Sequence, residues 1–413
     1  MEALALNFEI PANTSRFRLL SLGLFFFLTF TNFANLWMTV FYLMFALALI
    51  APQFQVALPK KTWIIFLLLL SLAFGTSLMS INAVDPSVIA PTELLRFARY
   101  DFKKYLPSDE SLLLRAIAIL KVAASFLVAS FELSRPGSKK DFLFAFEMIF
   151  RTLLFFWFFQ FGFYHLTGMV LDPSGAGRFV GTSSEGLLFR ATGFFNEPGT
   201  YGNVMFALAV IRFLLLRKGF DLWNRVLFVS LLGSFSLFGW FFAALLVLVL
   251  TRWTKESVIK FLSIGGVSAI VIGPIFAQYF AYRLDREVST SYSLATKVWA
   301  YDSWLQQGLW RQFIGNWGWN DCGCLYNDSG LFFVILNEFG LTALLLGIGF
   351  IIYNFKKLRI RLGFLLAGMM LLKMGFLQPL MGVFWATYLS RYLERRPGHP
   401  TEPFTTRWEK SNV

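Results

Sequence analysis

The chain has 413 residues, of which 57% are hydrophobic and 15% are charged, and its formal net charge is +13 at pH 7. Soluble domains usually carry about a quarter charged residues and at most about half apolar ones, so this composition excludes an ordinary soluble protein. Because a helix needs about 20 apolar residues to cross a bilayer, the repeated long apolar runs predict an all-α, polytopic bundle of membrane helices.

The apolar runs predict about twelve transmembrane helices. Residues 1–15 lack the basic start and apolar core of a cleavable signal peptide, so we expect the first helix, which follows Arg16 and Arg18, to be a true span. In chain order the predicted spans are 19–34, 36–51, 63–80, 112–130, 142–166, 200–216, 226–237, 239–251, 259–280, 329–353, 362–376 and 379–391.

Basic residues concentrate in the connections that fall on one side of this layout. They include Lys60, Lys61, Arg135, Lys139, Lys140, Arg217, Lys218, Arg225, Arg252, Lys255, Lys260, Lys356, Lys357, Arg359, Arg361, Arg391, Arg395 and Arg396. The positive-inside rule therefore places both termini in the cytoplasm. The excess positive charge is a signal of topology, and we expect no nucleic-acid partner.

Two predicted segments are too short to be simple pairs of spans. Residues 226–250 lie between basic flanks, and two crossings would leave only about 12 residues each, roughly 18 Å of helix for a core of about 30 Å. Residues 362–390 are likewise too short for two full spans, and Gln378-Pro379 marks the expected break between their two helices. One tilted span is the alternative at both places. In the first segment a break is marked by Gly233, Ser234, Ser236 and Gly239, and broken helices are tolerated where they line a protected cavity.

We expect residues 1–396 to form a single transmembrane domain and residues 397–413 to form a polar cytoplasmic tail. Long periplasmic loops are predicted at about 81–111, 167–199 and 281–328. Within the first loop, residues 94–106 have the pattern of an amphipathic helix lying at the membrane surface. An ordinary solvated loop is the alternative for that stretch.

Residues able to hold a metal are sparse. His165 and His399 are the only histidines and are too far apart for a histidine zinc site. Cys322 and Cys324 lie in a predicted outer loop, where a ring with one intervening residue is too strained to favour a structural disulfide. No phosphate-binding loop is present, which disfavours an ATP-driven pump. We expect no metal and no cofactor.

The most informative segment is 186–203, GLLFRATGFFNEPGTYGN, where an outer loop enters a span. Pro198 suits the first position of a helix, whose N-terminal amides would then face the outer surface and favour anions. Arg178 and Arg190 add donors suited to phosphate. Glu197 is a candidate general base. The alternative for Glu197 is that it caps the helix and pairs with Arg190.

A second segment, 327–341, reads NDSGLFFVILNEFGL and opens a late span. Asp328 is a candidate base or acceptor for a sugar hydroxyl, and a helix N-cap is the alternative. Arg283 and Arg286, earlier in the same loop, either bind phosphate or pair with nearby carboxylates. Inside the fifth span, Glu147 and Arg151 have the spacing of an ion pair on one helical face.

Together, RATGFFNEPGTYG at 190–202 and NDSGLFFVILNEFGL at 327–341 resemble the bacterial O-antigen and exopolysaccharide repeat-unit polymerases, which share a superfamily with the O-antigen ligases. The resemblance extends to about twelve spans, a large outer loop before the tenth, and internal termini. Ligases carry a histidine where this chain has Asp328-Ser329, which weakens the ligase interpretation and leaves the base unassigned.

The resemblance implies a glycosyltransferase at the periplasmic face of the bacterial inner membrane. Such enzymes transfer a growing chain from undecaprenyl diphosphate to the non-reducing end of a new lipid-linked repeat unit, without a metal. A separate membrane protein often regulates chain length. We accordingly expect catalytic roles for Glu197, Asp328 and Arg190, and diphosphate or sugar binding by Arg178, Arg283, Arg286, Tyr201 and Asn196.

Aromatic residues offer stacking faces for sugars. Tyr201 is one candidate, and Trp310, Trp317 and Trp319 in the outer loop are others, although anchoring at the membrane interface is the commoner role of such tryptophans. Two further functions stay open at this point. One is an O-antigen ligase that transfers polysaccharide to the lipid A core. The other is a transporter of lipid-linked sugars, which would be expected to show two related halves.

Overall fold

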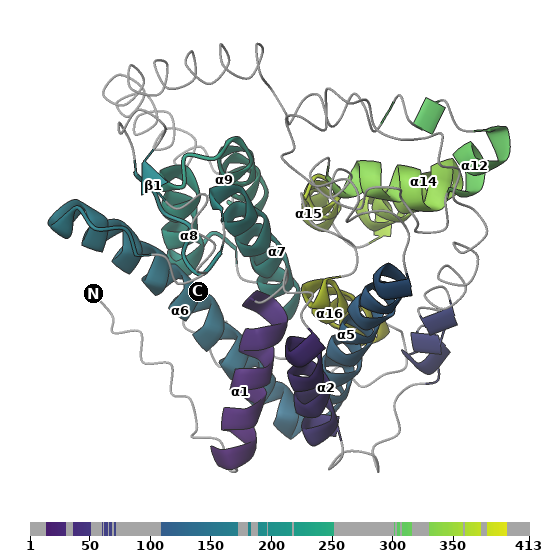
Figure 1. Ribbon diagram of the computed structural model, residues 1–413, viewed down its shortest axis with the longest axis horizontal. Coiled ribbons are helices and arrows are strands. Elements are labelled where there is room, and N and C mark those ends of the chain that lie inside the picture. The colour runs from purple at the N-terminus through teal and green to yellow at the C-terminus, as the bar shows by residue number, and fades with distance from the viewer. Residues whose placement is uncertain are drawn as a thin grey trace, which may run out of the picture.

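The computed structural model describes residues 14–29, 36–50, 109–171, 189–195, 197–216, 219–251, 330–357, 360–372 and 378–394, with residues 181–182 and parts of 60–71 and 301–315. This part of the chain is almost entirely helical (Figure 1). Several expected features lie outside it: the loop 81–111 with its helix 94–106, most of the spans 63–80 and 259–280, most of the loop 281–328, and the tail 397–413.

Most of the described helices overlap predicted spans, but α1 begins and ends five residues earlier than expected, and α12 lies in the predicted outer loop 281–328. They are α1 (Thr14–Thr29), α2 (Leu36–Ile50), α5 (Asp109–Ser134), α6 (Pro136–Thr167), α7 (Pro198–Leu216), α8 (Leu222–Gly233), α9 (Leu237–Leu250), α12 (Leu309–Ile314), α14 (Leu331–Lys357), α15 (Ile360–Met370) and α16 (Pro379–Glu394). Two antiparallel strands, β1 (Gly181–Thr182) and β2 (Phe189–Arg190), pair before α7.

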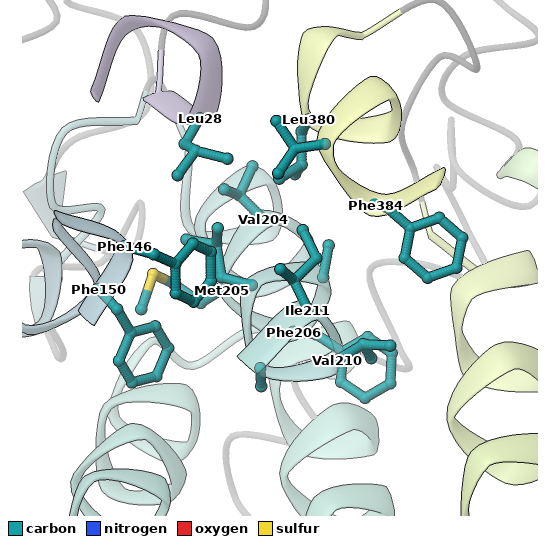
Figure 2. Packing of buried hydrophobic residues seen from close by; sticks show 14 of the residues in the cluster. Leu28, Phe146, Phe150, Val204, Met205, Phe206, Val210, Ile211, Leu380 and Phe384 are labelled. Carbon is teal, nitrogen blue, oxygen red and sulfur yellow. The ribbon is translucent and has the colours of Figure 1, made fainter. Parts of the chain in front are cut away.

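Helix α7 lies at the centre of the packed core. It is apolar on every side, which is the pattern of a helix surrounded by other helices, and nearly all of its residues are buried. Figure 2 shows Val204, Met205 and Ile211 of α7 packed between Phe146 of α6 on one side and Leu380 of α16 on the other. Side chains on α7 are therefore fixed in position by packing against α6 on one side and α16 on the other.

The predicted break within 226–250 is confirmed. Helix α8 ends at Gly233, helix α9 begins at Leu237, and the turn between them holds Phe235 at a φ of 47°. The two helices pack against each other, and the N–H of Phe220 bonds to the carbonyl of Leu250 at 3.1 Å. The segment is thus a helical hairpin that returns to its starting end, and the alternative of one tilted span does not apply.

The second predicted break is also present, since α15 ends at Met370 and α16 begins at Pro379. A further break lies inside α14, where Gly340 has a φ of 75°. A Cβ atom at Gly340 would overlap the backbone of Phe313 in the last turn of α12 and of Gly315, which directly follows that helix. Glycine is therefore required there both for its conformation and for the close approach of the two segments.

Polar contacts join helix ends that the charge pattern assigns to the cytoplasm. Arg16, at the start of α1, pairs with Glu132 near the end of α5 at 2.7 Å and donates to Ser138 at the start of α6 at 3.2 Å. Arg391, near the end of α16, donates to the last carbonyls of α7, those of Leu214 and Leu215. The predicted cytoplasmic ends of α1, α5 and α6 therefore meet, and so do those of α7 and α16.

Among the described residues, two helical stretches are long and apolar enough to cross a membrane by length and composition, Gly137–Thr167 and Pro198–Leu216. Apolar helices of 10–17 residues are also present, and they include both helices of the α8–α9 hairpin. The architecture is consistent with a helical membrane protein.

Candidate active site

The loop that precedes α7 is fastened to the second half of α6 by one buried side chain. The Oε1 atom of Gln160 accepts hydrogen bonds from the backbone N–H groups of Thr192 and Gly193, both at 2.8 Å. Its Nε2 atom donates to the carbonyl of Leu171 at 2.7 Å. Gln160 is fully buried, so these bonds satisfy backbone groups that water does not reach.

Replacing Gln160 by leucine is expected to loosen this loop. The substitution keeps the volume of the side chain but leaves two buried amides without an acceptor, at a cost of about 1–3 kcal/mol each. Hydrogen exchange of the Thr192 and Gly193 amides should become faster, and activity should fall with it. The control is Thr152→Val on the same helix, whose exposed hydroxyl bonds only to Met148 O. Unchanged exchange in Gln160→Leu would contradict this role.

Trp157 forms the centre of the packing beneath the loop. Its Nε1 donates to the carbonyl of Ala191 at 3.0 Å, and its ring stacks on Phe161 and on Tyr201, with centroids 5.4 and 6.0 Å apart. A Cβ atom at Gly233, at the end of α8, would lie only 2.6 Å from Cη2 of this ring. The tip of the α8–α9 hairpin is therefore pressed against the same tryptophan that holds the loop.

Tyr201 has a different position from the one expected for a sugar-stacking residue. Its side chain is fully buried, and its hydroxyl donates to Ser230 Oγ on α8 at 2.7 Å. Because the side chain is 0% exposed, neither face of the ring is open to a sugar; Trp157 stacks on one face and Gly193 lies against the ring edge. Tyr201 instead joins the start of α7 to the hairpin.

Glu197 directly precedes the first residue of α7, Pro198, as expected for a cap. Its Oε1 accepts a hydrogen bond from Thr200 Oγ1 at 3.2 Å. Within the described part of the chain, its second oxygen takes no hydrogen bond or ion pair. The side chain is partly exposed, so the carboxylate is held in place and is still reachable.

Arg190 lies on β2, opposite Gly181 of β1, and is partly exposed. The next residue is Ala191, which bonds to Trp157. Arg190 and Glu197 thus lie on one loop that is anchored to α6. The five other expected site residues lie outside the described part of the chain, as do the two cysteines; the five are Arg178, Asn196, Arg283, Arg286 and Asp328.

The predicted ion pair within α6 is confirmed and is part of a larger cluster that the sequence did not predict. Arg151 Nε lies 3.3 Å from Glu147 Oε2. The other oxygen of Glu147 binds Arg212 Nε of α7 at 2.6 Å, and Arg212 also binds both oxygens of Asp221, at 2.9 and 2.7 Å. Asp221 in turn caps α8 by accepting from the N–H of Asn224.

This cluster lies toward the end of α7 opposite to Glu197. The sequence carries a signal for this cluster, because Arg212 is a charged residue inside the apolar run 200–216. Gln160 and Trp157, which hold the loop, carry no comparable signal. The Arg212 side chain is 1% exposed and is fully engaged by carboxylates, so it ties α6, α7 and the start of α8 together.

Within the described residues, no three His, Cys, Asp or Glu side chains are grouped so that they could hold a metal ion. Among the described residues, the hydroxyls of Thr200 and Ser236 lie near Glu197. Hydroxyls and one carboxylate suit hydrogen bonding to another hydroxyl group.

Comparison with known families gives a match over the same region. Residues 157–298 match the family model described as WcaD colanic acid polymerase. The match begins at Trp157 and includes the loop with Arg190 and Glu197, helix α7 and the α8–α9 hairpin. It confirms the resemblance to the repeat-unit polymerases over this segment. No curated protein and no solved structure matches the chain.

Proposed function

We propose that this chain, whose residues 157–298 match a polymerase family, is a membrane glycosyltransferase that polymerises oligosaccharide repeat units carried on undecaprenyl diphosphate. The site faces the periplasm of a bacterial inner membrane. The observation that carries the proposal is that the matched segment contains the anchored loop with Arg190 and Glu197, together with the elements packed around it.

In the proposed reaction, a hydroxyl of the incoming lipid-linked unit attacks the anomeric carbon of the growing chain. The bond from that carbon to the diphosphate oxygen breaks, and undecaprenyl diphosphate leaves with the electron pair. Glu197 accepts the proton of the attacking hydroxyl, the role of a general base. Its reachable carboxylate oxygen at the start of α7 supports this assignment. Asp328 is the second candidate for the base.

Charge develops on the diphosphate as it leaves, and cations must stabilise it. We assign this role to Arg190 together with Arg178, Arg283 and Arg286, because arginine binds phosphate through several donors at once. Asn196, next to Glu197 in the chain, is assigned to sugar binding. With arginines in this role the reaction needs no metal and no other cofactor.

The assignment of sides is supported by the contacts between helix ends. Arg16, Glu132 and Ser138 join three ends that the basic loops assign to the cytoplasm, and Arg391 joins two more. Glu197 lies at the opposite end of α7 from the Arg391 contact. This arrangement favours a periplasmic position for the loop with Arg190 and Glu197. A membrane regulator of chain length is a proposed partner.

The proposal is tested by deleting the gene and separating cell-surface polysaccharide on a gel. We expect single repeat units and no ladder of longer chains, with the ladder restored by the wild-type gene. Long polymer that stays on its lipid carrier would instead indicate a ligase. An unchanged ladder in a strain without a second such enzyme would contradict both, and would favour a transporter of lipid-linked sugars.

A further inference from the structure

Three serines lie close together in the α8–α9 hairpin, and one of them differs from the others. Ser230 and Ser234 donate to backbone carbonyls, those of Leu227 and Leu231, at 2.8 and 2.7 Å. Ser236 is only 5% exposed, yet its hydroxyl neither caps α9 nor bonds to any other described group. Its oxygen is not one of the enclosed polar atoms that lack a partner, so it keeps contact with solvent and can bond to a group that comes from outside the chain.

The Ser236 hydroxyl points toward the first turn of α7, beside Glu197. A Cβ atom placed on Gly199 would lie 3.9 Å from Ser236 Oγ and 3.5 Å from Glu197 Oε1. Both oxygens therefore lie around the same small space next to Gly199. Because residue 199 is a glycine, its own side chain does not fill that space.

The position of Ser236 relative to Glu197 is fixed by tight packing. A Cβ atom at Gly202 of α7 would be 3.3 Å from Cα and 3.4 Å from the backbone nitrogen of Gly239 in α9. The Tyr201 hydroxyl bonds to Ser230, which lies in the last turn of α8, just before the tip of the hairpin. The first turns of α7 and α9 thus meet directly, and the tip of the hairpin has little freedom to move away from Glu197.

The chemistry of this space favours a neutral, hydroxyl-bearing group. The N-terminal ends of α7 and α9 would favour an anion, but Glu197 already supplies a negative charge there, and a phosphate would be repelled by it. A hydroxyl group can donate to the carboxylate, and a neighbouring hydroxyl on the same ring can exchange a hydrogen bond with serine.

We propose that Ser236 binds the acceptor sugar, through the hydroxyl adjacent to the one that Glu197 deprotonates. The inference rests on the proposed function and extends it by one substrate-binding residue. Ser236 orients the acceptor ring so that the attacking hydroxyl faces Glu197. It also makes the enzyme selective for acceptors that carry the adjacent hydroxyl.

The test compares Ser236→Ala with Ser234→Ala in the purified full-length protein. The donor is the lipid-diphosphate-linked repeat unit, and the acceptor is the same oligosaccharide on a short alkyl chain that lacks the diphosphate. Loss of one hydrogen bond should lower kcat/KM for the acceptor about tenfold in Ser236→Ala, with the KM of the donor unchanged. Ser236→Ala should melt close to the temperature of the wild type, because the hydroxyl makes no hydrogen bond to the described residues that alanine would lose.

Ser234→Ala is the matched control, since it removes a satisfied buried hydroxyl two residues away. It should lower the melting temperature and leave the acceptor kcat/KM within about twofold of the wild type. A third experiment uses acceptors that each lack one hydroxyl next to the attacking hydroxyl. For one of these acceptors the kcat/KM of the wild type should be about tenfold lower than for the complete acceptor. With that same acceptor, Ser236→Ala and the wild type should have equal kcat/KM.

Wild-type kinetics in Ser236→Ala would overturn the inference, as would a loss that raises the KM of the donor instead. If the wild-type enzyme is active, neither of these two results contradicts the proposed polymerase function. If the wild type forms no glycosidic bond from these substrates, and the deletion strain keeps its ladder, the proposed function fails and the role of Ser236 fails with it.

Discussion

Replacing Glu197 by glutamine is expected to lower the polymerisation rate by about 10²–10⁴-fold, the usual contribution of a general base. Glutamine has almost the same shape, and its amide oxygen can still accept the hydrogen bond from Thr200 Oγ1. The fold and the start of α7 should therefore persist while the proton acceptor is lost. The measurement is the initial rate with purified protein, together with the ladder in a complemented deletion strain.

Two further variants make the Glu197 result specific. Thr200→Val removes the hydrogen bond to Glu197 but keeps the carboxylate, and it should cost about tenfold or less. Asp328→Asn tests the second candidate for the base. If Asp328→Asn loses about 10²-fold or more and Glu197→Gln keeps most of the wild-type rate, the base is Asp328 and our assignment of Glu197 is wrong.

Replacing Arg212 by methionine is expected to have the largest effect on stability. The change leaves the carboxylates of Glu147 and Asp221 without the guanidinium that now binds both, and the Glu147 side chain is only 7% exposed. Breaking a buried ion pair by removing one partner costs about 3–5 kcal/mol. We expect a large fall in the melting temperature of the detergent-solubilised protein and a smaller yield of folded protein.

Arg151→Met is the matched control, because it removes the other arginine bound to Glu147. The Arg151 side chain is 27% exposed, its bond to Glu147 is longer at 3.3 Å, and Glu147 keeps Arg212. Pairs of this kind contribute about 1 kcal/mol or less. Some packing is also lost, because the Arg151 guanidinium lies 4.7 Å from the centre of the Trp223 ring. Equal melting temperatures for the two variants would contradict the structural role of Arg212.

The two groups of variants separate folding from chemistry along one helix. Glu197 precedes the first turn of α7 and Ser236 of the α8–α9 hairpin lies beside that turn, whereas Arg212 lies toward the other end of α7. We expect variants at the first turn to reduce turnover in a stable protein. Variants of Arg212 should reduce the amount of folded protein, and any molecules that do fold should retain their rate.

Local features of the sequence were sufficient to predict most of the described helices and two of their breaks, but not α12 or the break at Gly340. Long apolar runs predicted α6 and α7, and the small residues at 233–239 predicted the turn between α8 and α9. Pro198 predicted the start of α7, and the four-residue spacing of Glu147 and Arg151 predicted their pair. Each of these features depends on residues close together in the chain, where spacing and turn chemistry act directly.

The tertiary structure decided which residues meet across helices. Arg212 binds Glu147, 65 positions away, and Tyr201 is buried against Trp157 and Ser230 instead of facing a sugar. The sequence predicts for Ser236 only that it marks a break between two helices. The packing of Gly202 on Gly239 brings the Ser236 hydroxyl beside Glu197. Helical periodicity gives the faces of a helix, but its partner and its rotation depend on how side chains interlock across the whole bundle. The sequence therefore identified the candidate residues of the loop at 190–197, and the fold determined which side chains surround them.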